Sequence, residues 1–186
     1  LGVVWLTVAV NSLSAILAAA TVLIYVVAYT PLKRHTALCT IVGAISGAIP
    51  PVIGWVSVKP SLDLGAWILF GILFTWQMPH FLALAWMYRD EYAGAGFVML
   101  RRDDVTGYKT AMDSLLYTLG LIVITLIPYH AGMNGEIYLG GALLLDGIML
   151  LFAVQFLIER ERVSARRLFF ASISFLPLIL GLMVFT

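Results

Sequence analysis

The sequence has 186 residues, of which 62% are hydrophobic and 11% are charged. Soluble domains contain about 45–50% apolar and about 25% charged residues, so this composition excludes an ordinary soluble domain and indicates a polytopic membrane protein. The formal net charge of +1 says little by itself, because the positions of the charges orient a membrane protein, and no nucleic-acid partner is expected. The single cysteine, Cys39, excludes an internal disulfide.

Apolar segments follow one another along the whole chain. A hydrocarbon core of about 30 Å needs about 20 apolar residues, so residues 1–10 predict only the end of a helix. The sequence starts inside this run without an initiator methionine or a basic signal-peptide region, so we expect N-terminal helices to be missing. We predict an all-α membrane protein, with one transmembrane domain over residues 1–186. It contains the partial span and six further spans, at residues 13–29, 38–58, 64–88, 114–129, 137–158 and 168–185.

Lysine and arginine predict which ends of the spans share a side of the membrane. The loops after the first, third and fifth spans hold two, four and four of the 11 cationic residues, and the intervening loops hold only Lys59. Cytoplasmic loops are enriched in Lys and Arg, so those three loops are predicted to face the cytoplasm. We expect an integral, multi-pass protein in the lipid bilayer of a bacterial plasma membrane.

Prolines and glycines mark two of the predicted spans. Pro31 is expected to end the first span, because proline does not continue a helix. Pro50 and Pro51 lie together inside the second span and are expected to break its hydrogen-bond ladder. Such a break is tolerated only where the backbone is buried in protein or lines a cavity. In the same span, Gly43 and Gly47 form a face of small residues that lets another helix approach closely.

The most informative stretch is residues 76–100, WQMPHFLALAWMYRDEYAGAGFVML. It places Gln77 and His80 deep in an apolar run, and ionisable groups at that depth usually face a bundle interior or a cavity. At about 1.5 Å per residue, Arg89 to Glu91 lie roughly 14–17 Å farther along the helix, at one membrane surface. The plainer alternative is a proline kink with a hydrogen-bonded histidine, followed by ordinary interfacial charges.

Two polar clusters at the predicted cytoplasmic surface have the chemistry of a diphosphate site. The segment YTPLKR offers a phenol and two cations, and RDEY offers two carboxylates and a cation. Cations neutralise phosphate oxygens, and carboxylates hold Mg²⁺, which takes phosphate oxygens as further ligands. Ordinary orientation signals have the same residue types, so the spacing alone leaves that alternative open.

Three segments resemble successive signature segments of one enzyme family: YTPLKR, GAISGAIPPVIGW, and WQMPHF with the acidic–Tyr pair and AG that follow it. Their order and spacing are similar to those of the heme O synthases (protoheme IX farnesyltransferases), which are UbiA-type intramembrane prenyltransferases. The resemblance covers essentially the whole chain. It implies nine transmembrane helices around a cavity open to the membrane. It also implies Mg²⁺-dependent transfer of a farnesyl group from farnesyl diphosphate to a vinyl group of heme b, giving heme O and diphosphate.

The resemblance implies a role for each matching residue. The implied catalytic residues are Lys33, Arg34, Arg89, Asp90 and Glu91, and the implied substrate-binding residues are Tyr29, Trp76, Gln77, His80 and Tyr92. Tyr29 and Lys33 match the element that contacts diphosphate. Asp90 and Glu91 match the second acidic motif, which helps to hold Mg²⁺. Imidazole can ligate heme iron, and the resemblance leaves an axial-ligand role for His80 open.

The sequence departs from the family pattern in three ways. The first acidic motif of the family is absent, so this segment alone is expected to be inactive. Glu91 stands where the family often has Asp, which keeps the charge on a longer side chain. Val98 and Arg101 replace two prolines, so the loop around them is expected to be more mobile.

Other interpretations stay open beside this one. A related prenyltransferase could act on a quinone precursor or a chlorophyllide, although WQMPHF argues against it. A non-catalytic bundle that handles or transports heme is the alternative from a different class. A downstream heme-modifying membrane enzyme is a further candidate partner of the heme O synthase.

Two features of the apolar spans are not explained by the family pattern. Asp146 is a lone acid in the fifth span and is expected to pair with a polar group on a neighbouring helix or to lie nearer the surface. Aromatic residues near the span ends are expected to anchor the protein at the membrane interfaces. These are Trp55, Trp67, Trp86 and Tyr138.

Overall fold

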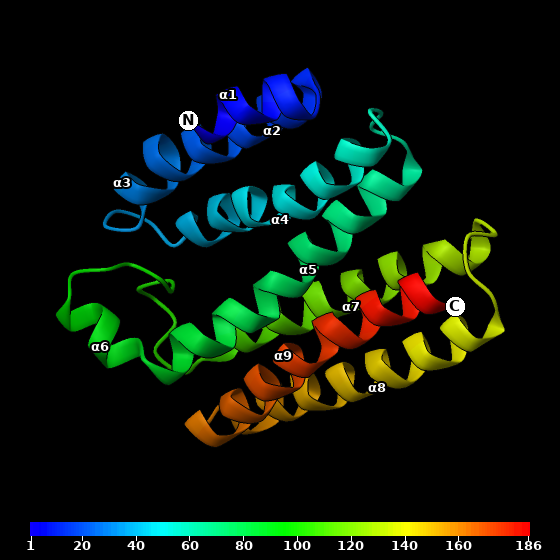
Figure 1. Ribbon diagram of the computed structural model, residues 1–186. Helices are drawn as coiled ribbons and strands as arrows, with labels where there is room; N and C mark the ends of the chain where they lie inside the picture. The colour runs from blue at the N-terminus through cyan, green and yellow to red at the C-terminus, as the bar shows by residue number, and fades with distance from the viewer.

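Long helices run back and forth across the molecule in a computed structural model that describes residues 1–186 (Figure 1). No strand is present. The first helices are α1 (Gly2–Ala9), α2 (Ser12–Leu23), the π-helical turn η1 (Ile24–Tyr29), α3 (Thr30–Leu32) and α4 (Cys39–Val58). The others are α5 (Leu64–Met87), α6 (Arg89–Gly94), α7 (Tyr108–His130), α8 (Glu136–Glu159) and α9 (Arg162–Phe185).

Six helical segments are long and apolar enough to cross a membrane, with α2, η1 and α3 together forming the first of them. The short α1 is the partial span. The predicted all-α membrane architecture of six spans and a partial one is therefore confirmed.

Two helices begin earlier than their apolar runs predict. The α7 helix starts at Tyr108 rather than 114, because the Asp104 carboxylate accepts hydrogen bonds from the first-turn amides of Lys109 and Thr110. The α9 helix starts at Arg162 rather than 168, because Glu161 and Ser164 form a capping box. Side-chain caps satisfy amides that have no helical partner, so both helices continue beyond the hydrocarbon segment.

The α5 helix connects the two parts of the bundle. It packs against α4 on one side and against α7 and α9 on the other, and α8 packs against α7 and α9. The main hydrophobic core lies among α5, α7, α8 and α9 and includes Ile72, Leu121, Met149, Phe156 and Phe175. Figure 1 shows α1, α2 and α4 as a layer above α7, α8 and α9, with α5 crossing between the two layers.

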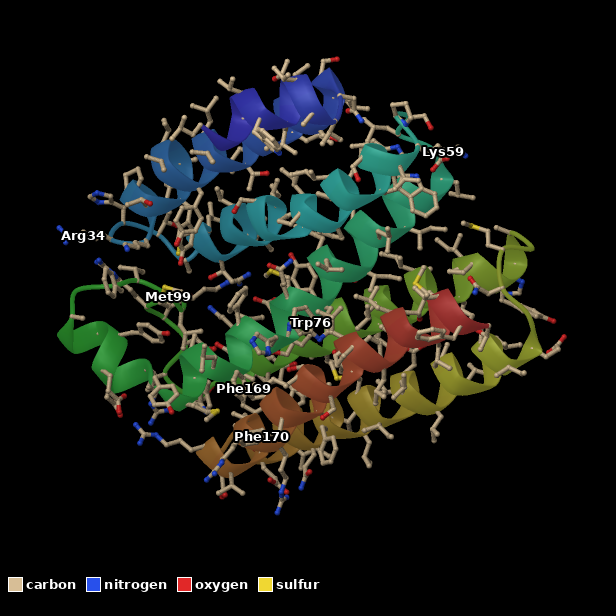
Figure 2. The ribbon with its side chains drawn as sticks, in the orientation of Figure 1. Arg34, Lys59, Trp76, Met99, Phe169 and Phe170 are labelled. Atoms are coloured by element: carbon tan, nitrogen blue, oxygen red, sulfur yellow. The ribbon has the colours of Figure 1, made fainter.

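The cationic loops lie at one end of the bundle. In Figure 1 the α3–α4 turn, α6 and the α8–α9 turn are all on the left, whereas the α4–α5 and α7–α8 turns are on the right. Arg34 and Lys59 mark these opposite ends in Figure 2. The loops that the charge pattern assigns to one side of the membrane therefore share one end of the molecule.

The prolines interrupt the helices less than the sequence predicts. The α4 helix continues through Pro50 and Pro51, and α3 contains Pro31 in its first turn. The first span ends at Leu32, one residue beyond Pro31. The expected break in the hydrogen-bond ladder is present at Pro50–Pro51, which have no N–H to donate, but the helical backbone of α4 continues through it. The fixed φ of proline lies in the helical range, so each proline removes one hydrogen bond without forcing the helix to end.

Candidate active site

A cavity of about 500 Å³ lies between α2, η1, α4 and α5. Most of its lining is apolar, and Tyr29, Gln77 and Tyr92 contribute polar groups. Tyr29 ends η1 and Tyr92 lies on α6, so both come from the end of the bundle that holds the cationic loops. The structure thus brings three of the predicted substrate-binding residues to one cavity.

Two glycines of α4 allow the cavity wall to form. A Cβ atom added at Gly47 would lie 2.2 Å from Oε1 of Gln77, and one added at Gly43 would lie 3.0 Å from the Tyr29 ring. The Gln77 amide also donates a hydrogen bond to the carbonyl oxygen of Leu73 at 3.0 Å. The predicted small-residue face is therefore where α5 and η1 approach α4 closely.

The prolines of α4 act on the same wall. Pro50 and Pro51 have no N–H, so the carbonyl oxygens of Ser46 and Gly47 lose their usual helical partners. Ser46 and Gly47 both line the 500 Å³ cavity. The helix stays intact, and the backbone acceptors that the prolines release belong to residues of the cavity wall.

The predicted diphosphate cations lie at the end of this region. Lys33 ends α3, and its ammonium lies 4.9 Å from the centroid of the Phe97 ring. Its carbonyl oxygen accepts a hydrogen bond from the Val98 amide at 2.8 Å. Arg34 is exposed in the turn that follows (Figure 2).

The two predicted metal ligands pair with a cation that sequence reasoning missed. Asp90 and Glu91 lie in the first turn of α6. One Arg162 nitrogen lies 2.7 Å from Oδ2 of Asp90 and 3.9 Å from Oε2 of Glu91. No ion pair joins either acid to Lys33 or Arg34. The run ERER, which leads from the end of α8 to the first residue of α9, was the available signal for Arg162.

Arg89 is held beside these acids by an aromatic ring. Its guanidinium lies 4.3 Å from the centroid of the Trp86 ring, and its Nε lies 3.7 Å from Asp90. Trp86 itself is 3% exposed and donates a hydrogen bond to the carbonyl oxygen of Arg160. The expectation that Trp86 is an interfacial anchor was wrong, because it packs beneath the polar loops.

The Trp76 and His80 side chains face α9, whereas Gln77 faces α4. The His80 ring stacks between the rings of Trp76 and Phe169, with centroid distances of 5.0 and 4.7 Å. Figure 2 shows Trp76 and Phe169 close together on neighbouring helices. The three residues predicted to bind substrate are therefore divided between two faces of α5. Trp76 and His80, four residues apart, share one face, whereas Gln77 comes one position after Trp76 and points about 100° away around the helix.

Ser172 of α9 completes this second cluster. Its side-chain oxygen lies 2.9 Å from Nδ1 of His80, and its carbonyl oxygen accepts a 2.7 Å hydrogen bond from Nε1 of Trp76. Ser172 and Phe169 were missed as site residues. The signal was a pair of serines in the otherwise apolar segment FFASISFLPL.

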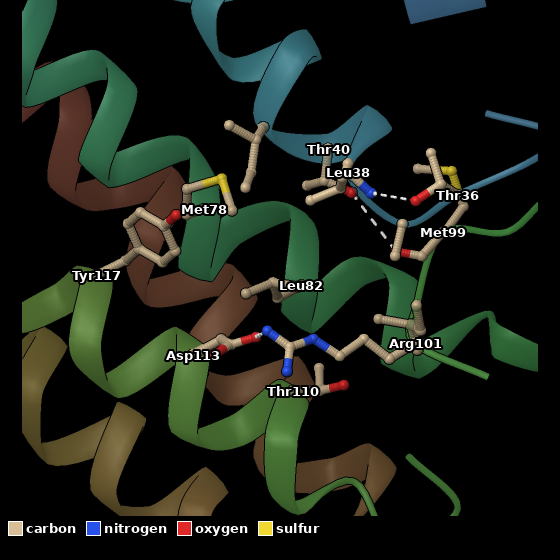
Figure 3. A pocket seen from close by; sticks show the side chains of 13 residues that line it. Thr36, Leu38, Thr40, Met78, Leu82, Met99, Arg101, Thr110, Asp113 and Tyr117 are labelled. Atoms are coloured by element: carbon tan, nitrogen blue, oxygen red, sulfur yellow. Dashed lines mark hydrogen bonds and ion pairs between the residues drawn. The ribbon is translucent and has the colours of Figure 1, made fainter. Parts of the chain in front are cut away.

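A second cavity, of about 320 Å³, lies on the other side of Met99 and Thr40. Arg101 reaches from the loop after α6 to Asp113 of α7, with 3.3 Å between nitrogen and oxygen (Figure 3). The loop that contains Val98 and Arg101 thus has a backbone hydrogen bond to Lys33 and an ion pair to α7. The mobility expected for this loop stays a prediction.

The carboxylates fit a metal that binds together with a phosphate group. No group of three or more His, Cys, Asp or Glu residues comes together in the chain. Asp90 and Glu91 are adjacent and exposed, with 71% and 61% of their side chains accessible. Mg²⁺ usually takes one or two carboxylates and completes its shell with water and substrate phosphate. This donor set therefore suits Mg²⁺ delivered with a diphosphate.

Asp146 lies in a buried network apart from both cavities. It is 2% exposed, and its Oδ2 lies 2.7 Å from Oγ1 of Thr125 on α7. The Tyr138 hydroxyl donates a 2.7 Å hydrogen bond to the Thr125 carbonyl oxygen. The expected pairing of Asp146 with a neighbouring helix is confirmed. Tyr138 is fully buried, so its expected role as an interfacial anchor was wrong.

Comparison with known sequences identifies the family. The UbiA prenyltransferase family matches residues 1–176. The chain belongs to the UbiA prenyltransferase family. No solved structure matches the chain significantly.

Several similar UbiA-family proteins carry the same name. A protein named protoheme IX farnesyltransferase from Solibacter usitatus is 46% identical over 98% of the chain and 63% of its own length. One from Koribacter versatilis is 39% identical over 94% of the chain and 58% of its length. The mitochondrial protein of that name from Homo sapiens is 39% identical over 98% of the chain and 41% of its length. The chain thus spans less than two thirds of each relative.

Proposed function

We propose that the full-length protein transfers a farnesyl group from farnesyl diphosphate to a vinyl group of heme b, releasing diphosphate and forming heme O. The observation that carries this proposal is the 46% identity over 98% of the chain to a protein named protoheme IX farnesyltransferase. Membership of the UbiA prenyltransferase family supports the same reaction class. The chain spans 63% of the length of that relative, so the proposal concerns the longer protein.

In this proposal Tyr29, Lys33 and Arg34 bind the diphosphate. The two cations lie next to each other after α3, and Tyr29 is one helical turn before Lys33. Ammonium and guanidinium groups form strong charge-assisted hydrogen bonds to phosphate oxygens. They also stabilise the negative charge that develops as the carbon–oxygen bond breaks.

Asp90 and Glu91 would hold Mg²⁺ against the diphosphate, with Arg89 beside them. When bound, the ion supplies further positive charge to the leaving group. The exposure of both carboxylates supports this role, because each keeps lone pairs free of helix or core contacts. Arg162 neutralises the pair when the metal is elsewhere.

The 500 Å³ cavity would accept the farnesyl chain. Its lining is mainly apolar, which suits an isoprenoid, and its polar groups come from Tyr29, Gln77 and Tyr92. A cavity of this kind excludes water from the reacting carbon until the acceptor is present. Trp76 and His80 lie on the adjoining face of α5 and would contact the porphyrin.

The reaction needs no protein nucleophile. The bond between C1 of the farnesyl group and the diphosphate oxygen breaks, and its electron pair leaves with diphosphate. The vinyl group of heme b attacks the allylic cation, which forms a carbon–carbon bond and leaves a cation beside the porphyrin ring. Water adds to that cation and loses a proton, giving the hydroxyethylfarnesyl side chain.

The cationic end of the bundle is proposed to face the cytoplasm of a bacterium, with the six spans in its plasma membrane. Lys and Arg are enriched in cytoplasmic loops, which supports this orientation. A downstream membrane enzyme that modifies heme O would then receive the product within the same bilayer.

The test uses the full-length protein in membranes with heme b, farnesyl diphosphate and Mg²⁺, and identifies heme products by mass. We expect a farnesylated heme from the wild type and a loss of at least about 100-fold in Lys33→Ala and Glu91→Ala, as when a positioned charge-stabilising group is removed. Lys59→Ala, at the opposite end of the bundle, is the matched control and keeps the activity. Absence of product from the wild type, under conditions where a named relative makes it, would contradict the proposal.

A further inference from the structure

His80 is held on three sides and open on one. Trp76 covers one face of its ring and Phe169 lies against the ring with a similar tilt, at interplanar angles of 20° and 23°. Its Nδ1 edge meets the Ser172 hydroxyl at 2.9 Å. These contacts leave only the edge that carries Nε2 free.

The hydroxyl of Ser172 determines which nitrogen of His80 carries the proton. Ser172 is fully buried, and its Oγ lies 2.6 Å from the carbonyl oxygen of Phe169, which can only accept a hydrogen bond. A serine hydroxyl has one proton to donate. Because that proton is used on Phe169, Oγ must accept from His80. Nδ1 is therefore the protonated nitrogen, and Nε2 has a free lone pair.

The lone pair on Nε2 is accessible. The His80 ring makes one hydrogen bond within the chain, and that bond uses Nδ1. Nε2 makes none. The polar side-chain atoms that are buried without a partner are Ser14 Oγ, Trp55 Nε1 and Asp146 Oδ1, and Nε2 of His80 is not among them. The side chain thus presents an unprotonated nitrogen at the molecular surface, deep along a membrane-spanning helix.

We propose that Nε2 of His80 is an axial ligand to the iron of the heme substrate, and that Ser172 is the residue that positions it. This inference rests on the proposed function, because it takes heme as the acceptor. Neutral imidazole is a common heme ligand, and ligating histidines almost always donate their other N–H to an oxygen that fixes the tautomer. The iron exchanges a weak ligand such as water for Nε2. No proton is released, because Nε2 is already unprotonated.

The placement of the cluster suits this role. His80 lies two to three helical turns from Asp90 and Glu91 along α5 and α6, and the vinyl groups of a porphyrin project from the ring edge, away from the iron. An iron held at His80 lets a vinyl group extend toward the cationic end of the bundle. The carbonyl oxygen of Ser172 also accepts a hydrogen bond from the Trp76 indole N–H. One residue of α9 therefore positions both the Trp76 and the His80 ring of α5.

The first experiment tests the ligand. Full-length protein in detergent is titrated with ferric heme b, and its absorption and electron paramagnetic resonance spectra are recorded with and without added imidazole. The wild type should give a nitrogen-ligated spectrum, and His80→Ala should lose it and weaken heme binding by at least tenfold. Added imidazole should restore the nitrogen-ligated spectrum of His80→Ala, which a purely structural loss would not allow. A His80→Ala spectrum identical to the wild type overturns the proposal.

The second experiment tests the positioning residue. Ser172→Ala removes the acceptor for Nδ1–H. We expect heme affinity to fall about tenfold and the spectrum to show a mixture of heme with and without the nitrogen ligand. Ser174→Ala on the same helix is the matched control, since its exposed hydroxyl contacts only the carbonyl of Phe170. If Ser172→Ala does not fold, Ser172→Cys keeps the volume with a weaker acceptor and is expected to shift the spectrum likewise. Wild-type affinity and spectrum in either variant would overturn the role of Ser172.

The outcomes separate this inference from the proposed function. Heme ligation is read from spectra without farnesyl diphosphate, and farnesyl transfer is read from product mass. A nitrogen-ligated heme that is lost in His80→Ala, with no farnesylated product, leaves the ligand assignment standing and removes the transferase. A farnesylated product together with an unchanged His80→Ala spectrum supports the transferase and removes the ligand assignment.

Discussion

The Val98 amide donates a 2.8 Å hydrogen bond to the carbonyl oxygen of Lys33. This hydrogen bond joins the loop after α6 to the end of α3, and its two residues are 65 positions apart in the chain. The resemblance to the family implies a proline at position 98, and proline has no amide proton to donate. Lys33 is a proposed diphosphate ligand, so this bond connects the loop directly to the backbone of the site.

Val98→Pro should therefore loosen the loop. The substitution removes one hydrogen bond, a loss of about 1 kcal/mol. We expect faster amide hydrogen exchange across residues 97–101 and a several-fold weaker affinity for farnesyl diphosphate. Val98→Ala keeps the N–H and is the control, with exchange close to the wild type. Unchanged exchange in Val98→Pro would mean that the Arg101–Asp113 ion pair alone holds the loop.

Gly47→Ala should displace Gln77 from the wall of the main cavity. The new Cβ would lie 2.2 Å from the Gln77 amide oxygen, which is the end of a flexible side chain and can move. We expect farnesyl transfer to fall at least tenfold while stability falls by about 1–3 kcal/mol, typical of overpacking. Gly54→Ala on the same helix meets no atom within 4 Å and should be neutral or stabilising. The double variant Gly47→Ala/Gln77→Ala should regain the lost stability, and no such recovery would place the strain elsewhere.

The buried network around Asp146 should matter for stability and not for transfer. Asp146→Asn keeps a hydrogen-bonding partner for Thr125, so its thermal unfolding in detergent should change by less than about 1 kcal/mol. Asp146→Ala leaves a cavity, although the Thr125 hydroxyl keeps its 2.9 Å hydrogen bond to the Ile122 carbonyl oxygen, and the expected loss is about 1–3 kcal/mol. Both variants should transfer farnesyl at the wild-type rate per folded molecule. An inactive but stable Asp146→Asn would instead make this acid a functional residue.

The helices could be predicted from the sequence because their apolar runs and charged ends carry the signal. The side-chain caps could not be predicted from the apolar runs, so the predicted starts of α7 and α9 were about six residues late. The sequence also predicted the hydrogen bonds lost at the prolines, but not that the helical backbone of α4 would continue through them. Pro50 and Pro51 remain helical where Ser46 and Gly47 border a cavity.

The individual site residues were found more readily than their partners. The family resemblance implied Tyr29, Gln77 and His80, each from a motif that is local in the sequence. Ser172 lies 92 positions after His80, and Arg162 lies 72 positions after Asp90. Such pairs depend on which helices pack together, and α9 meets α5 only in the folded bundle. Trp86 and Tyr138 were misplaced for the same reason, since an aromatic residue near a span end can face the lipid interface or the core.

Stability should fall at acid pH through Asp63, the N-cap of α5 at the end of the bundle that holds Lys59. The Lys59 ammonium, hydrogen-bonded to the Asp63 carboxylate, lowers the pKa of Asp63 below its ordinary value. A lowered pKa in the folded state contributes stability that is complete above the unfolded pKa and is lost as the pH falls through the folded pKa. Because Lys59 is exposed and Asp63 is partly exposed, solvent screens the pair and the effect is small. The melting temperature of Asp63→Asn, which keeps the helix cap, should be below that of the wild type at pH 7 and equal to it well below pH ~4. A gap that persists in acid would point to the cap instead of the charge.

Arg162 should compete with Mg²⁺ for the acidic pair. Its guanidinium lies 2.7 Å from Asp90, so the metal must displace a direct charge-assisted hydrogen bond to use that oxygen. In Arg162→Ala, calorimetry with inorganic diphosphate present should show Mg²⁺ binding several-fold more tightly, with half-maximal transfer at correspondingly lower Mg²⁺. Arg167→Ala, on the same helix and outside the ion pairs, should match the wild type. A higher Mg²⁺ requirement in Arg162→Ala would contradict competition. It would mean that Arg162 binds the diphosphate itself and that Asp90 orients the guanidinium for that purpose.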